Sequence, residues 1–545
     1  MFSLILGAAM AMQTADTIFV NGRVYVQKGR FETALAVSGE HVIAAGDDAQ
    51  IRALSTKGTR VVDLKGRLVT PGFNDAHVHF IDGGFGLLSV DLRDALDEAD
   101  FAGRIGRHAA GLPRGTWIQN GNWDHERWKS QALPTKQLID EVTKDNPVAV
   151  NRLDGHMILA NSAALRAAGI DRNTKDPFGG TIVRDASGEP TGILKDNAQD
   201  LLYKVLPDPT REMNVRAAKA ALAHAASLGV TSVQDNSSID ALPTYQQIRA
   251  EGGLTARLNV WRPASAMKSL IAAGIRSGLG DDWIRIGAIK ILSDGSMGAG
   301  TAAFFEPYTD EPTTSGLLLY PVEELNRMID EADAAGFQLA VHAIGDRANA
   351  LVLDAFEQTA KARARNDRRF RVEHSQVVRR ADLARYAALR VVASIQPSHC
   401  IDDMRWAPKR IGALRCKIAY NFKSFLEAGI PVAFGTDWFV EPLDPRIGLY
   451  AAVTRETLDG GPSGGFLPEE RIPLDDAIDL YTRGSAYAEF ADSRKGTLHP
   501  GMLADLVIFA DDLFKIDPKK ILTTPVDLTM VGGRLVFERT PPPTP

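Results

Sequence analysis

Residues 73–79 read FNDAHVH, and this stretch indicates the fold of the chain. His77 and His79 stand two positions apart, so on a β-strand both imidazoles point to the same side. In a closed barrel of strands that side is the interior, where two adjacent imidazoles are costly to bury unless their nitrogens find partners. A divalent metal is one such partner. A lone His-x-His is more often a surface or hydrogen-bonded pair, so the interpretation depends on the rest of the chain.

Apolar strand-like runs alternate with amphipathic helical patterns through the middle of the chain. This alternation is typical of parallel strands joined by helical crossovers. The strand-like runs cover residues 69–79, 231–235, 258–262, 284–292, 338–344, 370–374, 391–396 and 431–437. Helical patterns lie between most of them, for example over residues 214–228, 322–335 and 347–364. Eight such strands predict an α/β fold with a (βα)8 TIM barrel, whose chemistry lies at the carboxyl ends of the strands.

The two ends of the chain have a different pattern. Residues 14–68 and 495–545 contain short apolar strands separated by tight turns. Asn21-Gly22 and Gly532-Gly533 are typical of turns in β-hairpins. We therefore expect one small β-sandwich domain, built from both termini, beside a barrel domain over residues 69–494.

One connection in the barrel domain is too long for an ordinary βα unit. The first two strand-like runs, which end at residue 79 and begin at residue 231, are separated by far more than the usual two to six residues. We expect an inserted subdomain at residues 80–212, after the first barrel strand. Such an insertion is expected to cover the barrel mouth.

Composition and charge restrict the partners. The 545 residues are 45% hydrophobic and 24% charged, with a net charge of -6, as in an ordinary globular protein. A mildly acidic chain without a long basic run favours neither nucleic acid nor an anionic membrane surface. After the first residues, no apolar stretch reaches the roughly 20 residues of a membrane span. We expect a small-molecule substrate, with no nucleic acid and no membrane as partners.

The N-terminus leaves the location of the protein open. Residues 1–13 contain a short apolar run and the small-residue segment Ala9-Met10-Ala11, but no Lys or Arg precedes them. We interpret them either as a degenerate signal segment or as a disordered N-terminus. The protein is accordingly expected in the cytoplasm, or in the periplasm or outside the cell if the segment is a signal peptide.

Four more ionisable residues, Lys290, His342, His374 and Asp437, lie at or near the ends of predicted barrel strands. Lys290 is the least expected, because its strand is otherwise apolar and a buried ammonium is expensive without a partner. Desolvation lowers a lysine pKa and leaves an amine that reacts with carbon dioxide. The alternative is a snorkelling lysine or a salt bridge.

Taken together, these residues resemble the metal-binding pattern of the amidohydrolase superfamily. Three segments resemble more narrowly the amidohydrolase family 3 branch that includes N-substituted formamide deformylases. They are residues 289–296 (IKILSDGS), 342–348 (HAIGDRA) and 373–376 (EHSQ). The resemblance covers nearly the whole chain, including the split β-sandwich and the closing segment over residues 496–506.

The resemblance implies a centre of two divalent metals, with zinc as the default and manganese, iron or cobalt also suitable. The implied ligands are His77, His79, Lys290, His342, His374 and Asp437. The first two histidines and the aspartate are implied to hold one metal, the other two histidines the second, and the lysine, N-carboxylated, to bridge them. A metal-activated water is implied to attack the substrate carbonyl, while Asp437 accepts its proton and passes it to the leaving nitrogen. The family also implies a homo-oligomer, either a dimer or a tetramer.

Pocket residues are predicted outside the ligand set. His156 lies in a segment similar to one whose histidine reaches toward the metal site in the family, so it either helps to polarise the substrate carbonyl or caps the adjacent turn. Asp294 follows Lys290 closely and is a candidate to orient it or a ligand histidine. Five aromatic residues in predicted loops around the mouth are candidates for an aromatic pocket, although aromatics as often pack under a lid: Trp123, Trp128, Trp406, Trp438 and Phe439.

The sequence departs from the branch where the substrate is concerned. Residues 297–300 read MGAG where the branch has LGSR, so an arginine is missing, and Phe439 replaces the commoner proline. The predicted function is a metal-dependent hydrolase that cleaves an amide-like carbon–nitrogen bond of the N-acyl or N-formyl type. The alternative is a mononuclear deaminase, or a carbamate or ester hydrolase, on the same scaffold. A non-catalytic binding protein is least expected, because no ligand is lost.

Overall fold

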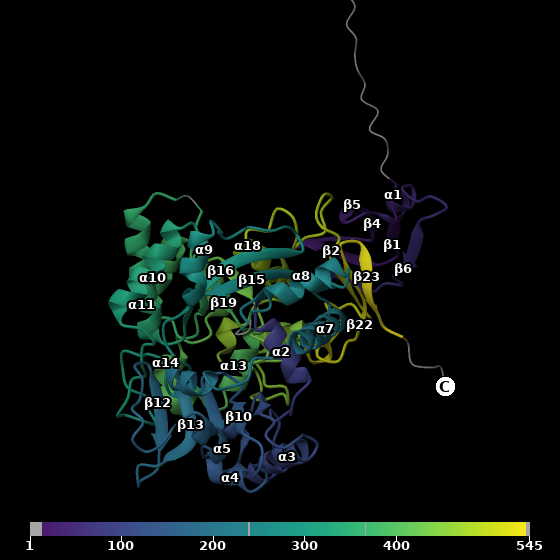
Figure 1. Cartoon of the computed structure of the whole chain (residues 1–545). Coiled ribbons are helices and arrows are strands. Elements are labelled where there is room, and N and C mark those ends of the chain that lie inside the picture. The colour runs from purple at the N-terminus through teal and green to yellow at the C-terminus, as the bar shows by residue number, and fades with distance from the viewer. Residues whose placement is uncertain (1–13, 238–239, 366, 541–545) are drawn as a thin grey trace, which may run out of the picture.

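The computed structural model describes residues 14–237, 240–365 and 367–540, and its largest sheet is a barrel of eight parallel strands (Figure 1). In order around the wall the strands are β8 (Phe73–Val78), β14 (Val230–Asp235), β15 (Arg257–Pro263), β16 (Ile284–Leu292), β17 (Leu339–Ala343), β18 (Arg371–His374), β19 (Val392–Ile395) and β20 (Val432–Phe434). A parallel bridge between Val78 and Trp438 brings the last strand back to the first. The predicted TIM barrel is confirmed. The predicted N-terminal segment, residues 1–13, lies outside the described residues.

Helices cover the outside of the barrel. The main ones are α2 (Phe80–Leu87), α7 (Arg211–Ser227), α8 (Leu242–Ala250), α9 (Met267–Ala272), α10 (Val322–Ala334), α11 (Asp346–Ala362), α12 (Arg380–Leu389), α15 (Phe422–Glu427), α16 (Pro445–Thr454), α17 (Leu474–Asp479) and α18 (Ser485–Ala488). In α10 the buried residues Leu325, Met328 and Ile329 form one apolar stripe toward the sheet. Because the sheet is covered on both faces, its strands are almost wholly buried, which explains their continuous apolar sequences. Across the described residues, none of the helices has the length and apolar character needed to cross a bilayer.

The β-sandwich is assembled from both ends of the chain, and its purple and yellow strands lie side by side in Figure 1. The N-terminal strands are β1 (Thr17–Val20), β2 (Arg23–Gln27), β3 (Arg30–Glu32), β4 (Ala34–Ser38), β5 (His41–Gly46), β6 (Arg60–Asp63) and β7 (Leu68–Pro71). The C-terminal strands are β21 (Leu506–Phe509), β22 (Val526–Val531) and β23 (Arg534–Glu538). One sheet has the order β5-β4-β1-β6 and the other β23-β22-β21-β7-β2-β3. Buried residues of both sheets, such as Phe19, Val24 and Leu506, form the core between them.

The two predicted turns have different outcomes. Gly532-Gly533 joins the antiparallel strands β22 and β23, as expected. The Asn21-Gly22 hairpin is wrong, because β1 pairs with β4 and β6 while β2 pairs with β3 and β7. Asn21 does adopt a left-handed backbone, with φ 57°, but the turn passes the chain from one sheet to the other. Burial of Phe19 and Val24 in the same core prevails over local pairing of the two strands.

The first predicted barrel run, residues 69–79, consists of two strands. β7 pairs with β21 in the sandwich, whereas β8 pairs with β14 in the barrel. Gly72 separates them, and a Cβ at this position would lie 2.2 Å from side-chain atoms of Thr231. The close approach therefore requires glycine at the joint between the two domains.

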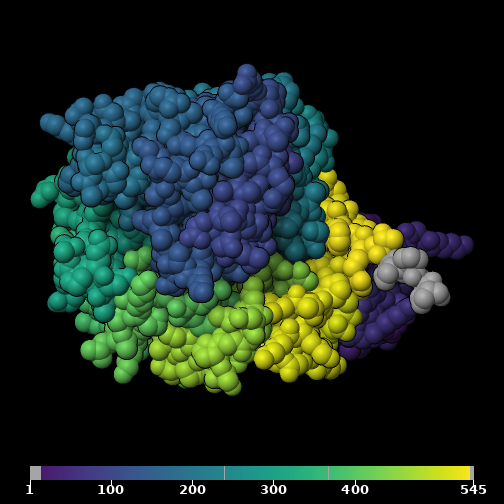
Figure 2. All heavy atoms as spheres, turned by 90° about the horizontal axis from the view of Figure 1, so that it is seen from below, coloured from purple at the N-terminus to yellow at the C-terminus, as the bar shows by residue number. Residues whose placement is uncertain are grey.

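The long connection after β8 contains a sheet of its own. Its strands are β9 (Ile118–Gln119), β10 (Val148–Asn151), β11 (Met157–Ala160), β12 (Gly180–Arg184) and β13 (Pro190–Asp196), and its helices include α3 (Glu98–Ala110), α4 (Lys136–Asp140), α5 (Ser162–Ala167) and α6 (Asp200–Tyr203). Figure 2 shows this blue subdomain spread over one face of the molecule. By contrast α2, which directly follows β8, packs against α7 and belongs to the barrel wall.

We expect the Asp505→Asn variant to unfold at a lower urea concentration than the wild type. Arg257 of β15 is buried and donates to both oxygens of Asp505, at 2.7 and 2.9 Å, where the chain enters β21. Removal of the carboxylate leaves a buried guanidinium without its ion-pair partner, which costs about 3 kcal/mol. Asp145→Asn, at an exposed ion pair with Arg114, is the control and is expected to cost less than about 1 kcal/mol. Equal midpoints for the two variants would contradict the expectation.

Candidate metal centre

The six predicted ligand residues all line one cavity of about 420 Å³. They are His77 on β8, His79 at the start of α2, Lys290 on β16, His342 on β17, His374 at the end of β18 and Asp437 after β20. Parallel pairing aligns their strands, since Leu292 stands opposite His342 and Ala343 opposite His374. The cavity therefore lies at the carboxyl ends of the strands, where a TIM barrel places its chemistry.

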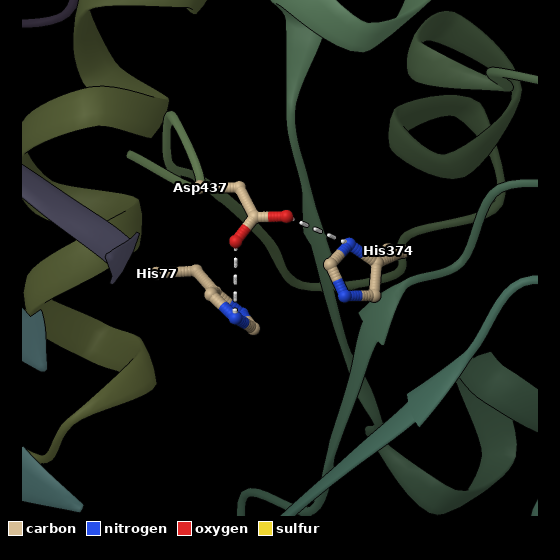
Figure 3. Close-up of side chains that lie close together, drawn as sticks. All are labelled: His77, His374 and Asp437. Carbon is tan, nitrogen blue, oxygen red and sulfur yellow. Dashed lines mark ion pairs between the residues drawn. The ribbon is translucent and has the colours of Figure 1, made fainter. Parts of the chain in front are cut away.

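His77, His374 and Asp437 form the tightest group (Figure 3), and one ligand atom from each lies within 4.8 Å of the others. Oδ1 of Asp437 lies 3.5 Å from Nε2 of His77, and Oδ2 lies 3.8 Å from Nδ1 of His374. The backbone of His374 and Asp437 is left-handed, with φ 74° and 59°. Such strain in residues other than glycine clusters at functional sites, because the surrounding structure must hold it in place.

The donor set of this group fits a divalent cation. Oδ1 of Asp437 is buried and accepts no hydrogen bond from the described residues, which is costly for a carboxylate unless a cation is present. Burial lowers the pKa of His77 and of His374 well below the ordinary value. Both imidazoles are therefore neutral, which is the form that binds a metal.

The other three predicted ligands surround this group. Nε2 of His79 lies 3.3 Å from Oδ1 of Asp437, and Nζ of Lys290 lies 3.3 Å from Nε2 of His77. Burial lowers the pKa of Lys290 to about 8, which increases the share of neutral amine. The ring centroid of His342 lies 4.6 Å from that of His374, but its Nε2 points to the carbonyl oxygen of Gly295, at 3.1 Å. His342 thus lies at the site with its ring nitrogen turned away from the group.

Sequence reasoning missed a buried pair, Glu373 and Arg371, which holds the ring of His77 through its Nδ1. Oε2 of Glu373 lies 2.7 Å from Nδ1 of His77, so Nε2 of the ring faces the cavity. Arg371 donates to both oxygens of Glu373, and also to Gln234 and Ser394. Arg371 and Glu373 stand two positions apart on β18, as His77 and His79 do at the end of β8 and just after it, and this spacing was the signal available in the sequence.

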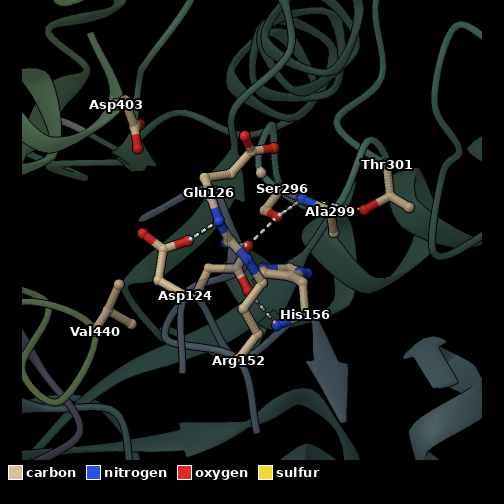
Figure 4. A network of polar contacts seen from close by, with 12 residues as sticks. Asp124, Glu126, Arg152, His156, Ser296, Ala299, Thr301, Asp403 and Val440 are labelled. Atoms are coloured by element: carbon tan, nitrogen blue, oxygen red, sulfur yellow. Dashed lines mark hydrogen bonds and ion pairs between the residues drawn. The ribbon is translucent and has the colours of Figure 1, made fainter. Parts of the chain in front are cut away.

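His156 reaches the cavity from the inserted subdomain. Its Nδ1 lies 2.6 Å from Oδ1 of Asp196, at the end of β13, and its ring centroid lies 5.2 Å from that of His342. Figure 4 shows it beside Arg152 and Ser296, within a polar network that joins the insertion to the barrel. Both His156 and Asp196 line the cavity. Asp196 was missed because only the fold brings it to His156, 40 residues away along the chain.

Of the predicted pocket residues, Trp406 and Phe439 line the cavity, whereas Trp123, Trp128, Trp438 and Asp294 do not. Trp123 packs in the core of the insertion, and Trp438 packs in the core of the barrel. Asp294 accepts hydrogen bonds from backbone N–H groups of two loops, and its Oδ1 lies 3.5 Å from Nε2 of His342. That distance is consistent with the predicted orienting role.

Helix α13 (Pro397–Asp403) adds two cavity residues that sequence reasoning also missed. Nε2 of His399 lies 3.6 Å from Oδ2 of Asp437, and its ring stacks on that of His374 at 6.0 Å. Asp403 follows four residues later, so it lies one turn along on the same face of the helix. The polar residues that directly follow β19 were a signal, because chemistry in this fold gathers after strand ends.

A parallel barrel with histidines and an aspartate converging at the carboxyl ends of its strands defines a metal-dependent hydrolase. The amidohydrolase family model matches residues 60–537, and the chain belongs to this family. The expectation of an enzyme of the amidohydrolase class is therefore confirmed, and a divalent metal belongs to its chemistry.

Individual relatives match over almost their whole length. The Arabidopsis thaliana protein LONG AFTER FAR-RED 3 is 34% identical over 96% of this chain and 92% of its own. The N-substituted formamide deformylase of Arthrobacter pascens is 28% identical over 97% of this chain and 99% of its own. A crystal structure of an uncharacterized metal-dependent hydrolase from Pyrococcus horikoshii OT3 has a TM-score of 0.75 and 32% identity, and covers 92% of this chain and 99% of its own. The predicted resemblance is confirmed.

Proposed function

We propose that this amidohydrolase uses two divalent metals, with zinc as the first choice, to cleave an amide-like carbon–nitrogen bond of the N-acyl or N-formyl type. The observation that carries the proposal is the group of His77, His374 and Asp437, in which a buried carboxylate oxygen accepts no hydrogen bond from any described residue. Lys290 beside His77 supports a second metal, because a lysine in this position, once N-carboxylated, offers bridging oxygens. The relative named as a formamide deformylase supports the type of bond.

His77, His79, His374 and Asp437 would hold metal in the cavity, with His342 and Lys290 completing the set after a change of rotamer. When bound, the metals supply Lewis acidity, which polarises a carbonyl group and lowers the pKa of water. The carboxylate of Asp437 accepts the proton of the attacking water and delivers it to the leaving nitrogen. Its position on the cavity wall suits it to that role, as does its buried Oδ1, which accepts no hydrogen bond from the described residues.

His156 orients the substrate oxygen in this proposal. Burial opposes a charge on the ring, but the hydrogen bond and the charge of Asp196 outweigh it and raise the pKa of His156. With Nδ1 held by Asp196, the protonated ring offers an Nε2–H donor to an oxygen in the cavity. The insertion thereby contributes to the chemistry as well as to the walls of the cavity.

The test compares metal content by elemental analysis in the wild type and in Lys290→Ala, together with hydrolysis of a panel of N-formyl and N-acyl amides. We expect about two metals per wild-type chain, falling to one or none in the variant, with kcat/KM lowered by about 100-fold or more. Lys195→Ala is a matched control, because Lys195 is also largely buried but donates to the carbonyl oxygen of Ala299 and does not line the cavity.

One metal in both proteins, with activity retained in Lys290→Ala, would remove Lys290 from the centre. The mononuclear alternative would then stand, and carbamates, esters and exocyclic amines would replace the amide panel. Loss of metal and activity in the Lys195→Ala control as well would indicate a general effect on folding, which thermal unfolding of the same samples would reveal.

A further inference from the structure

Outside the metal centre, most charged side chains on the cavity wall are paired. The pairs are Asp154 with Arg152, Glu441 with Arg93 and Asp196 with His156, each at 2.6 Å. Asp403 is different. Within the described residues, no nitrogen of a lysine, arginine or histidine lies within 4.0 Å of its carboxylate oxygens. Among the described residues the Asp403 carboxylate, on the wall of the cavity, therefore has no cationic partner, and its charged form is costly there unless a ligand supplies one.

Both side-chain hydrogen bonds of Asp403 are accepted by the same oxygen, Oδ2. Oδ2 accepts from the amide of Gln376 and from the hydroxyl of Tyr420, both at 2.7 Å, and both donors are neutral. Of the described residues, none donates a hydrogen bond to Oδ1, which is not among the fully enclosed atoms. Burial raises the pKa of Asp403 to about 7. The side chain is thus fixed through one oxygen and offers the other to the cavity.

The nearest cation cannot fill this position. Arg152 is buried, and its two terminal nitrogens donate to Asp154 and Asp124, at 2.6 and 3.1 Å. Figure 4 shows Asp403 apart from Arg152 and Asp124, with no line to either, although Asp403 and Arg152 line the same cavity.

Two further features describe the ligand group that fits beside Asp403. Trp406, three residues along, also lines the cavity, and an indole face attracts a cation. Asp403 lies four residues, about 6 Å along the helix axis, after His399, whose Nε2 lies 3.6 Å from Oδ2 of Asp437. The site is therefore close enough for one small molecule to reach both places.

We infer that the substrate carries a positively charged amine, which Asp403 and Trp406 bind about one helical turn from the scissile carbonyl. The inference deepens the proposed amide hydrolysis and rests on it for the position of the carbonyl. A primary or secondary ammonium donates to Oδ1 and completes the ion pair that the protein leaves open. Neutral amides of the same length bind without that ion pair and are poorer substrates.

The test measures binding rather than turnover, so that it is independent of the bond that is cleaved. Butylammonium and 1-butanol, which have similar size and differ in charge, are titrated by calorimetry into the metal-loaded wild type. We expect butylammonium to bind at least about tenfold more tightly. In Asp403→Asn this preference should fall to about threefold or less, because the amide keeps an acceptor oxygen for Gln376 and Tyr420 but carries no charge.

Asp402→Asn is the matched control, since Asp402 is the neighbouring residue, pairs with Arg405 and does not line the cavity. It should keep the tenfold preference. Equal binding of butylammonium and 1-butanol by the wild type would overturn the inference, and so would an undiminished preference in Asp403→Asn. If Asp403→Asn does not fold, the comparison of butylammonium with 1-butanol in the wild type tests the inference by itself. If the wild type prefers butylammonium but hydrolyses none of the N-formyl and N-acyl amides, the proposed reaction is rejected while the cation site is supported.

Discussion

The Asp437→Asn variant is expected to lose about 10³-fold in kcat/KM and to retain less metal than the wild type. Asp437 contacts both His77 and His79 through Oδ1, and it contacts His374 through Oδ2. Asparagine has nearly the same shape, but it lacks the charge that attracts a cation and the basicity that accepts a proton. The decrease in kcat/KM should therefore be larger than the decrease caused by replacing a residue that only orients the substrate.

Steady-state kinetics and elemental analysis of the same preparation check this expectation. Asp444→Asn is a suitable control, because Asp444 caps α16 and pairs with Arg446 without lining the cavity. The control should change kcat/KM by less than about threefold. If Asp437→Asn kept its metal and most of its activity, another group would have to accept the proton, and the role given to Asp437 would be wrong.

The barrel was predictable because each strand carries its own signal. A parallel strand that is covered on both faces must be apolar along its length, so all eight runs stood out from the sequence, and residues 284–292 match β16 at both ends. Residues 69–79 show the limit of that signal. An apolar run does not say which sheet it joins, and only the pairing of β7 with β21 reveals that the run is shared between two domains.

The metal centre was predictable for a similar reason, since barrel topology places every strand end at one rim. His77, Lys290 and Asp437 could be placed at one site from strand position alone. Trp123 shows what this reasoning lacks, because a loop aromatic in sequence turned out to be the core of the insertion. Asp403 shows the converse, since its lack of a cation depends on side-chain directions that no sequence pattern contains.

A second large effect is expected at the base of the centre, where Glu373→Gln removes the buried charge between His77 and Arg371. Oε1 of Glu373 accepts from Nε of Arg371 at 2.8 Å, and Oε2 lies 2.7 Å from Nδ1 of His77. Both Glu373 and Arg371 are fully buried, and within the described residues Glu373 is the carboxylate that pairs with Arg371. Glutamine leaves that guanidinium uncompensated, so the free energy of unfolding should fall by about 3–5 kcal/mol.

The same substitution should weaken metal binding by about 10- to 100-fold, because His77 loses the carboxylate that orients its ring. Urea unfolding of metal-free protein isolates the effect on the fold, and chelator competition on folded protein isolates the effect on the metal. Glu357→Gln, at a partly exposed pair with Arg385, should change stability by less than about 1 kcal/mol and leave metal affinity unaltered.

In the double variant Arg371→Met with Glu373→Gln, the loss of stability should be smaller than in Glu373→Gln alone, since no buried charge is then left unpaired, while the metal affinity should stay low. Recovery of both properties together would mean that Glu373 acts through the fold alone and does not position His77.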